Sequence, residues 1–244
     1  MKRLSLLFLV GILAISCNYE YKARAIDSMA FFDEKNGITI GDPTDTCISI
    51  ILTHDAGETW KKIACSKLPV AIEGEASFAA SNTNIAIVKN TVWVVTGGAK
   101  ERVFKSTDKG ETWQVFETPI IQGNGPQGIY SVDFADELQG IIIGGDYSKP
   151  LENTTNKAIT KDGGKTWTIV ANGKNPAYKS CVQYVPNTQG KEVFAVGKSV
   201  VSYSNDGGLT WKEVSTDSYC SIQFVDQNTA WLSGPQKIGK LLLN

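Results

Sequence analysis

Short apolar runs alternate with polar turns rich in Gly, Asn and Asp along the chain from residue 26 onward. Runs of this length, bounded by turn residues, are typical of β-strands. No stretch of useful length repeats its apolar residues with the helical period. The pattern therefore predicts an all-β domain whose strands fall into five groups. The expected strands are 26–32, 37–41, 47–53 and 59–63; 75–81, 91–97, 102–106 and 112–116; 129–135, 140–145, 156–160 and 166–170; 179–185, 191–197, 200–204 and 210–214; and 219–225, 229–234 and 237–243.

One eight-residue phrase occurs within four of these groups, with the pattern Ser/Thr-x-Asp-x-Gly-x-Thr-Trp. Its copies, called here the repeat turns, are residues 53–60, 106–113, 160–167 and 204–211, and they start 53, 54 and 44 residues apart. A near-constant period of this size indicates a repeat architecture.

Each residue type in the repeat turn suits a tight hairpin. The Asp accepts hydrogen bonds from N–H groups of its own turn, the Gly takes positive φ, and the Trp covers the side of the sheet. These side chains are expected to be structural rather than chemical. They are Asp55, Gly57 and Trp60; Asp108, Gly110 and Trp113; Asp162, Gly164 and Trp167; and Asp206, Gly208 and Trp211.

Groups of four strands repeated around an axis form a β-propeller, so five groups predict five blades. The fifth group lacks an outer strand. Residues 19–24 are expected to supply that strand and close the ring, which protects an open sheet edge.

The first 16 residues are predicted to be a signal peptide, with Lys2 and Arg3 before a short apolar run. Residues 13–17 resemble a bacterial lipobox, which implies cleavage before Cys17 and lipidation of that residue. An ordinary signal-peptidase site is the alternative, and both readings export the chain. The expected domains are the signal peptide (1–16), an anchor with the possible ring-closing strand (17–25) and the propeller (26–244). The expected location is the bacterial cell envelope, with membrane contact through the lipid anchor alone.

The repeat turns resemble the Asp box, or BNR repeat, of sialidases, some xyloglucan hydrolases and sortilin-type receptors. Residues 31–43 also parallel residues 134–146. Together with 72–81, 95–99 and 184–186, they resemble bacterial propellers similar to photosystem II stability and assembly factors. This resemblance implies a binding or assembly role, because families that share the box share little chemistry.

Composition and residue counts disfavour several activities. The formal net charge of −1 gives no basic excess for nucleic acid. Sialidases hold their substrate with three arginines, but only Arg24 and Arg102 remain once Arg3 leaves with the signal peptide. The glycine-rich stretch 123–128 precedes an expected strand rather than a helix, so it predicts a linker and no dinucleotide cofactor. His54 lies within a repeat turn, and no Cys/His cluster predicts a metal site.

The end of the propeller opposite the repeat turns is the expected functional face, called here the mouth. Asp42 and Asp146 follow equivalent second strands, and Glu73 and Glu75 precede an expected first strand. The expected binding residues are Asp42, Glu73, Glu75, Tyr130, Asp146, Tyr178 and Lys179. The preferred function is non-catalytic binding of a protein or glycan in the envelope. The alternative is a glycoside hydrolase that acts on polysaccharide through Asp42, Asp146, Glu73 or Glu75 as paired carboxylates.

Four cysteines remain after Cys17. Cys181 and Cys220 lie at similar points on neighbouring expected strands and are able to approach, although buried free thiols are the alternative. Export permits a disulfide, and the sequence leaves the state of Cys47 and Cys65 open.

Overall fold

A computed structural model describes residues 26–243. This part of the chain is all-β, with one short 3-10 helix, η1 (Cys65–Lys67), beside its strands. The predicted signal peptide, Cys17 and the ring-closing strand at 19–24 lie outside the described residues. No helix among the described residues is long and apolar enough to cross a membrane.

The first sheet has the predicted order β1-β2-β3-β4. Its strands are β1 (Ile26–Phe31), β2 (Gly37–Thr44), β3 (Cys47–Thr53) and β4 (Lys61–Lys62). One face buries the isoleucines of β2 and β3 in a shared apolar cluster with Val92, Val94 and Phe104 of the second sheet.

The second sheet corrects one prediction from the sequence. Its strands are β6 (Ile85–Val88), β7 (Thr91–Val95), β9 (Arg102–Ser106) and β10 (Gln114–Glu117). The first strand is therefore β6 and not residues 75–81. The short hairpin at Lys89–Asn90 fixes β6 onto β7, and the side chain of Asn84 just before it bonds to Ser28 of the first sheet.

The displaced segment joins a different sheet. The strands β5 (Glu75–Ala76) and β8 (Gly97–Gly98) extend the third sheet, whose order is β14-β13-β12-β11-β8-β5. The other strands of this sheet are β11 (Gln127–Phe134), β12 (Gly140–Asp146), β13 (Lys157–Thr160) and β14 (Thr168–Ile169).

The last two sheets follow the prediction closely. The fourth contains β15 (Cys181–Tyr184), β16 (Val193–Val196), β17 (Val201–Ser204) and β18 (Lys212–Ser215). The fifth has three strands, β19 (Ser221–Phe224), β20 (Thr229–Gly234) and β21 (Lys237–Leu242), so its outer strand is absent from the described residues.

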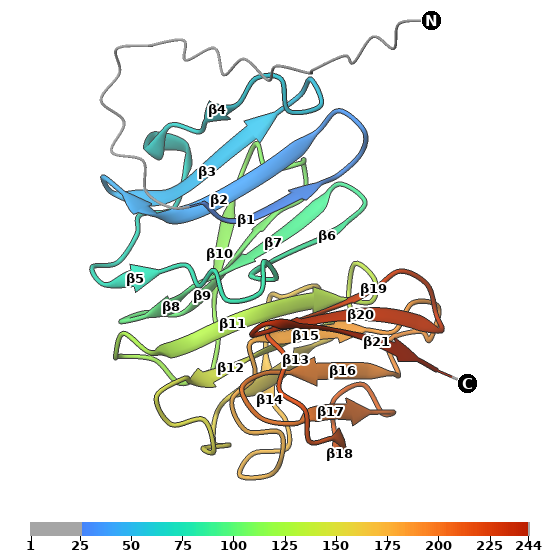
Figure 1. The fold of residues 1–244 in the computed structure, drawn as a ribbon. Coiled ribbons are helices and arrows are strands. Elements are labelled where there is room, and N and C mark those ends of the chain that lie inside the picture. Colours follow the sequence, from blue (N-terminus) through green and yellow to red (C-terminus); the bar gives the residue numbers. More distant parts are fainter. Residues whose placement is uncertain (1–25, 244) are drawn as a thin grey trace, which may run out of the picture.

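The five sheets lie face to face along the chain, with apolar clusters between neighbours (Figure 1). The first strands β1, β6, β11, β15 and β19 pack against one another in that order. A line of small polar side chains ties them together: Ser81 Oγ donates to the carbonyl of Ser180, and Ser221 Oγ donates to the carbonyl of Ser81.

A disulfide joins Cys47 on β3 to Cys65 in η1. Cys181 and Cys220 do not form a disulfide. Cys181 is a buried free thiol and Cys220 is an exposed one. The disulfide anchors the segment after β4 to the first sheet.

Candidate binding site

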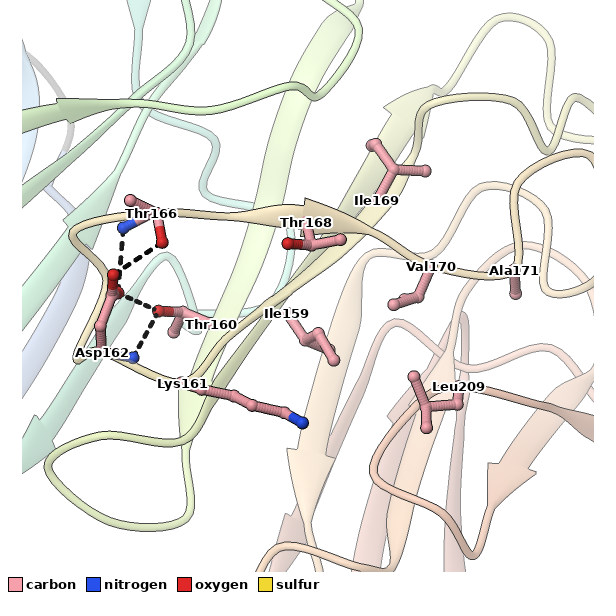
Figure 2. Close-up of a pocket in the computed structure, with 10 residues that line it drawn as sticks. All are labelled: Ile159, Thr160, Lys161, Asp162, Thr166, Thr168, Ile169, Val170, Ala171 and Leu209. Atoms are coloured by element: carbon pink, nitrogen blue, oxygen red, sulfur yellow. Dashed lines mark hydrogen bonds between the residues drawn. The ribbon is translucent and has the colours of Figure 1, made fainter.

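The four repeat turns have one hydrogen-bonding arrangement. In the third, Asp162 Oδ1 accepts the N–H of Thr166 at 2.9 Å, and its Oδ2 accepts Thr166 Oγ1 at 2.6 Å (Figure 2). Trp167 Nε1 donates to the carbonyl of Gly164 at 3.1 Å, and Gly164 has φ of 86°. The other turns repeat these contacts. Every Asp of a repeat turn is thus committed to its own turn.

The strand register places the repeat turns and the mouth at opposite ends of the sheets. In the first sheet, Gly37 pairs with Thr53 beside the turn, whereas Thr44 pairs with Cys47 at the other end. In the third sheet, Gly140 pairs with Thr160 near the turn, whereas Asp146 lies at the far end of β12. Asp42 and Asp146 therefore both lie away from the repeat turns, as the strand order predicts.

Aromatic side chains gather at the mouth in a group called here the tyrosine cluster: Phe78, Tyr130, Tyr147 and Tyr178. Phe78 stacks on Tyr130 with ring centroids 4.1 Å apart, and Tyr178 meets Tyr130 edge-on at 5.0 Å. Tyr147 meets the same ring edge-on at 6.4 Å. Burial, followed by the neighbouring tyrosines, raises the pKa of Tyr130, so its hydroxyl stays protonated and donates to the carbonyl of Pro126 at 2.9 Å.

The exposed part of the tyrosine cluster carries a positive charge. Tyr147 is 45% exposed, and Lys198 Nζ lies 5.1 Å from the centre of its ring. Lys198 Nζ also donates to the carbonyl of Tyr147 at 3.1 Å. Neither residue was among the expected binding residues, although Tyr147 directly follows β12 and Lys198 lies two residues after β16.

Asp146 lies beside the tyrosine cluster but is already engaged. Its Oδ1 accepts the N–H of Ser148 at 2.9 Å and the hydroxyl of Ser148 at 2.5 Å, and Gln127 Nε2 lies 3.4 Å from Oδ2. Burial alone would raise the pKa of Asp146, but the bonds from Ser148 outweigh it and hold the pKa below its ordinary value. A carboxyl group held ionised in this way is unsuited to act as a general acid.

Glu75 is a structural residue. Its side chain is fully buried and pairs with Arg102, with 2.5 Å between Oε2 and Nη2 and 3.0 Å between Oε1 and Nε. Its two oxygens also accept Thr96 Oγ1 and the N–H of Ile72. These bonds fasten the segment before β6 to the second sheet, so the carboxylate is not available to a ligand.

Two other predicted residues lie outside the tyrosine cluster. Glu73 is exposed in the loop before β5. Lys179 is fully buried, and its Nζ donates to the carbonyls of Ser199 at 2.5 Å and Val200 at 2.9 Å. Burial lowers the pKa of Lys179 to about 8. Lys179 therefore holds the turn before β17 rather than presenting a charge to the mouth.

The mouth end also holds a carboxylate pair that the sequence did not reveal. Asp27 lies at a bulge in β1, and its carboxylate accepts the backbone N–H of Asp42. Burial, and then the charge of Asp42, raise the pKa of Asp27 to about 6. Asp42 Oδ1 accepts the N–H of Ser77 at 3.0 Å, directly before Phe78 of the tyrosine cluster. Tyr130 lies at the equivalent bulge in β11, which explains why both residues turn toward the mouth.

Glu101, just before β9, is a second buried acid at this end. It is fully buried, and its Oε2 accepts Thr118 Oγ1 at 2.5 Å, while Oε1 has no hydrogen-bond partner. Burial raises the pKa of Glu101 to about 8. The carboxyl group is consequently protonated at neutral pH.

A hollow at the other end of the molecule lies beside the third repeat turn. Its volume is about 580 Å³, and Leu209 of the fourth repeat turn lies across from Ile159 and Val170 (Figure 2). Its one carboxylate, Asp162, already accepts hydrogen bonds from Thr160 and Thr166. The hollow therefore offers no free carboxylate for chemistry, and we place the candidate site at the tyrosine cluster.

A comparison with models of protein families shows to which family the chain belongs. The model of the Sortilin-Vps10 family, described as sortilin, neurotensin receptor 3, matches residues 48–197, which is 150 of the 244 residues. The chain belongs to the Sortilin-Vps10 family. The match covers three repeat turns and the whole tyrosine cluster, and it assigns the chain to a family of β-propellers. No curated protein matches the chain.

Solved structures support the same fold for this member of the Sortilin-Vps10 family. A nidogen/laminin complex matches with a TM-score of 0.61 at 13% identity over 91% of this chain and 77% of that chain. The WD40 propeller of Doa1 matches with a TM-score of 0.56 at 12% identity, covering 90% of this chain and 66% of that one. The GH74 xyloglucanase from Xanthomonas campestris also has a TM-score of 0.56 at 12% identity, but the matched part is 89% of this chain and 35% of the enzyme. At these identities the matches establish a β-propeller fold and nothing about activity.

Proposed function

We propose that this protein is a five-bladed Asp-box propeller of the bacterial cell envelope that binds a protein partner through the tyrosine cluster. In this proposal the signal peptide at 1–16 exports the chain, lipidated Cys17 anchors it, and residues 19–24 complete the fifth blade. The shared contacts of the four repeat turns support the Asp-box assignment. The disulfide between Cys47 and Cys65 supports export, because disulfides persist in oxidising compartments.

The tyrosine cluster is the observation that carries the binding function. Tyrosines are enriched at protein interfaces because they provide a large contact area with little rotamer entropy to lose. Here packing already fixes Tyr130 and Tyr178, which are largely buried, while Tyr147 and Lys198 are exposed to a partner. Fixed buried rings beneath an exposed aromatic ring and a lysine are features of surfaces that recognise a polypeptide.

The glycoside-hydrolase alternative has less support. Two catalytic carboxyl groups must both face the substrate. Among the four proposed acids, Glu75 is buried in an ion pair and Asp146 is held by Ser148. Asp42 is joined to Ser77, and Glu73 lies in a separate exposed loop.

Photo-cross-linking in the native envelope tests the proposal. A photoreactive phenylalanine analogue at Tyr147 is expected to capture a distinct protein, and Lys198→Glu is expected to abolish that capture. Tyr203 is the matched control, because Lys212 Nζ lies 5.0 Å from its ring on another part of the surface. Equal capture from positions 147 and 203, or capture unaffected by Lys198→Glu, would contradict the proposal.

A further inference from the structure

Two buried polar atoms at the mouth end of the first sheet have no hydrogen-bond partner, although they lie next to a carboxylate. They are Asp27 Oδ2 and Ser77 Oγ. Asp27 is 9% exposed and Ser77 is 7% exposed. Leaving a buried polar atom unpaired is costly, and it is rare in folded proteins. Two such atoms, in residues that each share a hydrogen bond with Asp42, indicate a missing ligand.

The contacts around Asp42 bring the three residues together. The Asp42 backbone N–H donates to the Asp27 carboxylate, and Asp42 Oδ1 accepts the N–H of Ser77 at 3.0 Å. These bonds bring together Asp27 of β1, Asp42 of β2 and Ser77 of the segment that follows β5. Because two like charges in a buried site disfavour each other, a bound cation would stabilise the arrangement.

We propose that Asp27, Asp42 and Ser77 bind a calcium ion at the mouth end of the first sheet. All the available side-chain donors are oxygens, which hard cations prefer, and nothing soft is present to favour zinc or copper. Calcium tolerates irregular oxygen geometry, and water completes its shell where the protein supplies few ligands. The residues that the structure describes contain no group of three or more Cys, His, Asp or Glu side chains placed to hold a metal ion, and the proposed site has only two carboxylates. The site is therefore expected to be weak, with a Kd of about 10⁻⁴ to 10⁻³ M, in the range of extracellular calcium modules.

The ion has a structural consequence for the tyrosine cluster. Ser77 directly precedes Phe78, whose ring stacks on Tyr130. Calcium between β1, β2 and Ser77 fixes the segment that carries Phe78 and so fixes one side of the candidate binding site. The cation site stands on its own contacts and does not depend on which partner the tyrosine cluster binds.

Calcium titration of the purified protein tests this inference at pH 8, with NaCl added to keep the ionic strength constant. The melting temperature of the wild type is expected to rise by about 3–8 °C between zero and about 10 mM CaCl₂, with the rise following the logarithm of the calcium concentration above the Kd. Asp27→Asn is expected to lose this rise. In the absence of calcium it should melt no lower than the wild type, because the substitution removes a buried charge without changing the shape.

Asp45→Asn is the matched control, since Asp45 lies on the same hairpin but its side chain is 81% exposed. This variant should keep the full calcium response. Ser77→Ala should weaken calcium binding, so its melting temperature should rise less than that of the wild type at each calcium concentration. Absence of a rise in the wild type, or an equal rise in Asp27→Asn, would overturn the proposed site.

Discussion

Carboxylates with a full set of hydrogen bonds occur at both ends of the propeller, whereas among the described residues those with an unpaired buried oxygen lie at the mouth. At the repeat turns, Asp162 accepts four hydrogen bonds from its own turn, and these hold its pKa at about 2 against the opposing effect of burial. At the mouth, Asp27 Oδ2 and Glu101 Oε1 are buried without a partner, and burial raises the pKa of both residues. Fully hydrogen-bonded carboxylates therefore stabilise the fold, whereas the unpaired oxygens of Asp27 and Glu101 leave buried acceptors at the mouth.

The largest expected effect tests the structural role of the turn end. Trp167→Ala removes a side chain that is 9% exposed and packs edge-on against Phe134, so unfolding free energy should fall by about 3–5 kcal/mol. Chemical denaturation measures this change. Trp231→Ala is the matched control, because Trp231 is 48% exposed and should contribute much less. Equal losses of unfolding free energy for the two variants would show that the repeat-turn tryptophan contributes no more than an exposed one.

A smaller loss should follow from the turn carboxylate itself. Asp162→Ala leaves the N–H groups of Lys165 and Thr166 without their acceptor, which should cost about 1–3 kcal/mol. Thermal and denaturant unfolding measure the loss, and Asp45→Ala should change stability by less than about 0.5 kcal/mol because Asp45 is exposed. Cross-linking from position 147 should be unchanged in folded Asp162→Ala protein. A loss of cross-linking at normal stability would mean that the two ends are not independent.

The buried carboxyl group of Glu101 should make the stability of the fold depend on pH. The folded pKa of about 8 lies above the model-peptide value of 4.5, so between these values the folded state keeps a proton that the unfolded state has released. Stability contributed by Glu101 is therefore complete below pH 4.5 and is lost as pH rises toward 8. The loss should be about 1.4 kcal/mol between pH 6 and pH 7.

Glu101→Gln should remove this contribution, because the amide does not titrate. The stability difference between the variant and the wild type should widen from pH 5 to pH 8, while the exposed control Glu73→Gln should follow the wild type. Parallel pH profiles for Glu101→Gln and the wild type would show that Glu101 is not held protonated. Asp162 should show the opposite sign, since its depressed pKa stabilises the fold above pH 4 and loses that effect as pH falls toward 2.

The sequence identified the repeat turns because everything they need lies within eight residues. In the third turn, the side chains of Thr160, Asp162, Thr166 and Trp167 hydrogen-bond only within residues 160–167. Strand order followed from the same local signals, and order alone fixes which end of a sheet receives Asp42 and Asp146. Propeller class was therefore predictable from the chain, and the family match agrees with it.

Tertiary structure decided what the mouth contains, because its contacts join segments far apart in the sequence. Asp42 meets Ser77 across 35 positions, and Arg102 meets Glu75 across 27. No local pattern distinguishes Glu75, which is neutralised by an ion pair, from Asp27, which a bulge leaves without a full set of partners. The apolar run at 85–88 likewise became the first strand of the second sheet only because β7 pairs with it and Asn84 bonds to Ser28. A local hydrogen-bond pattern can be read from the residues that form it, whereas the burial and pairing of a charge depend on what the rest of the chain brings beside it.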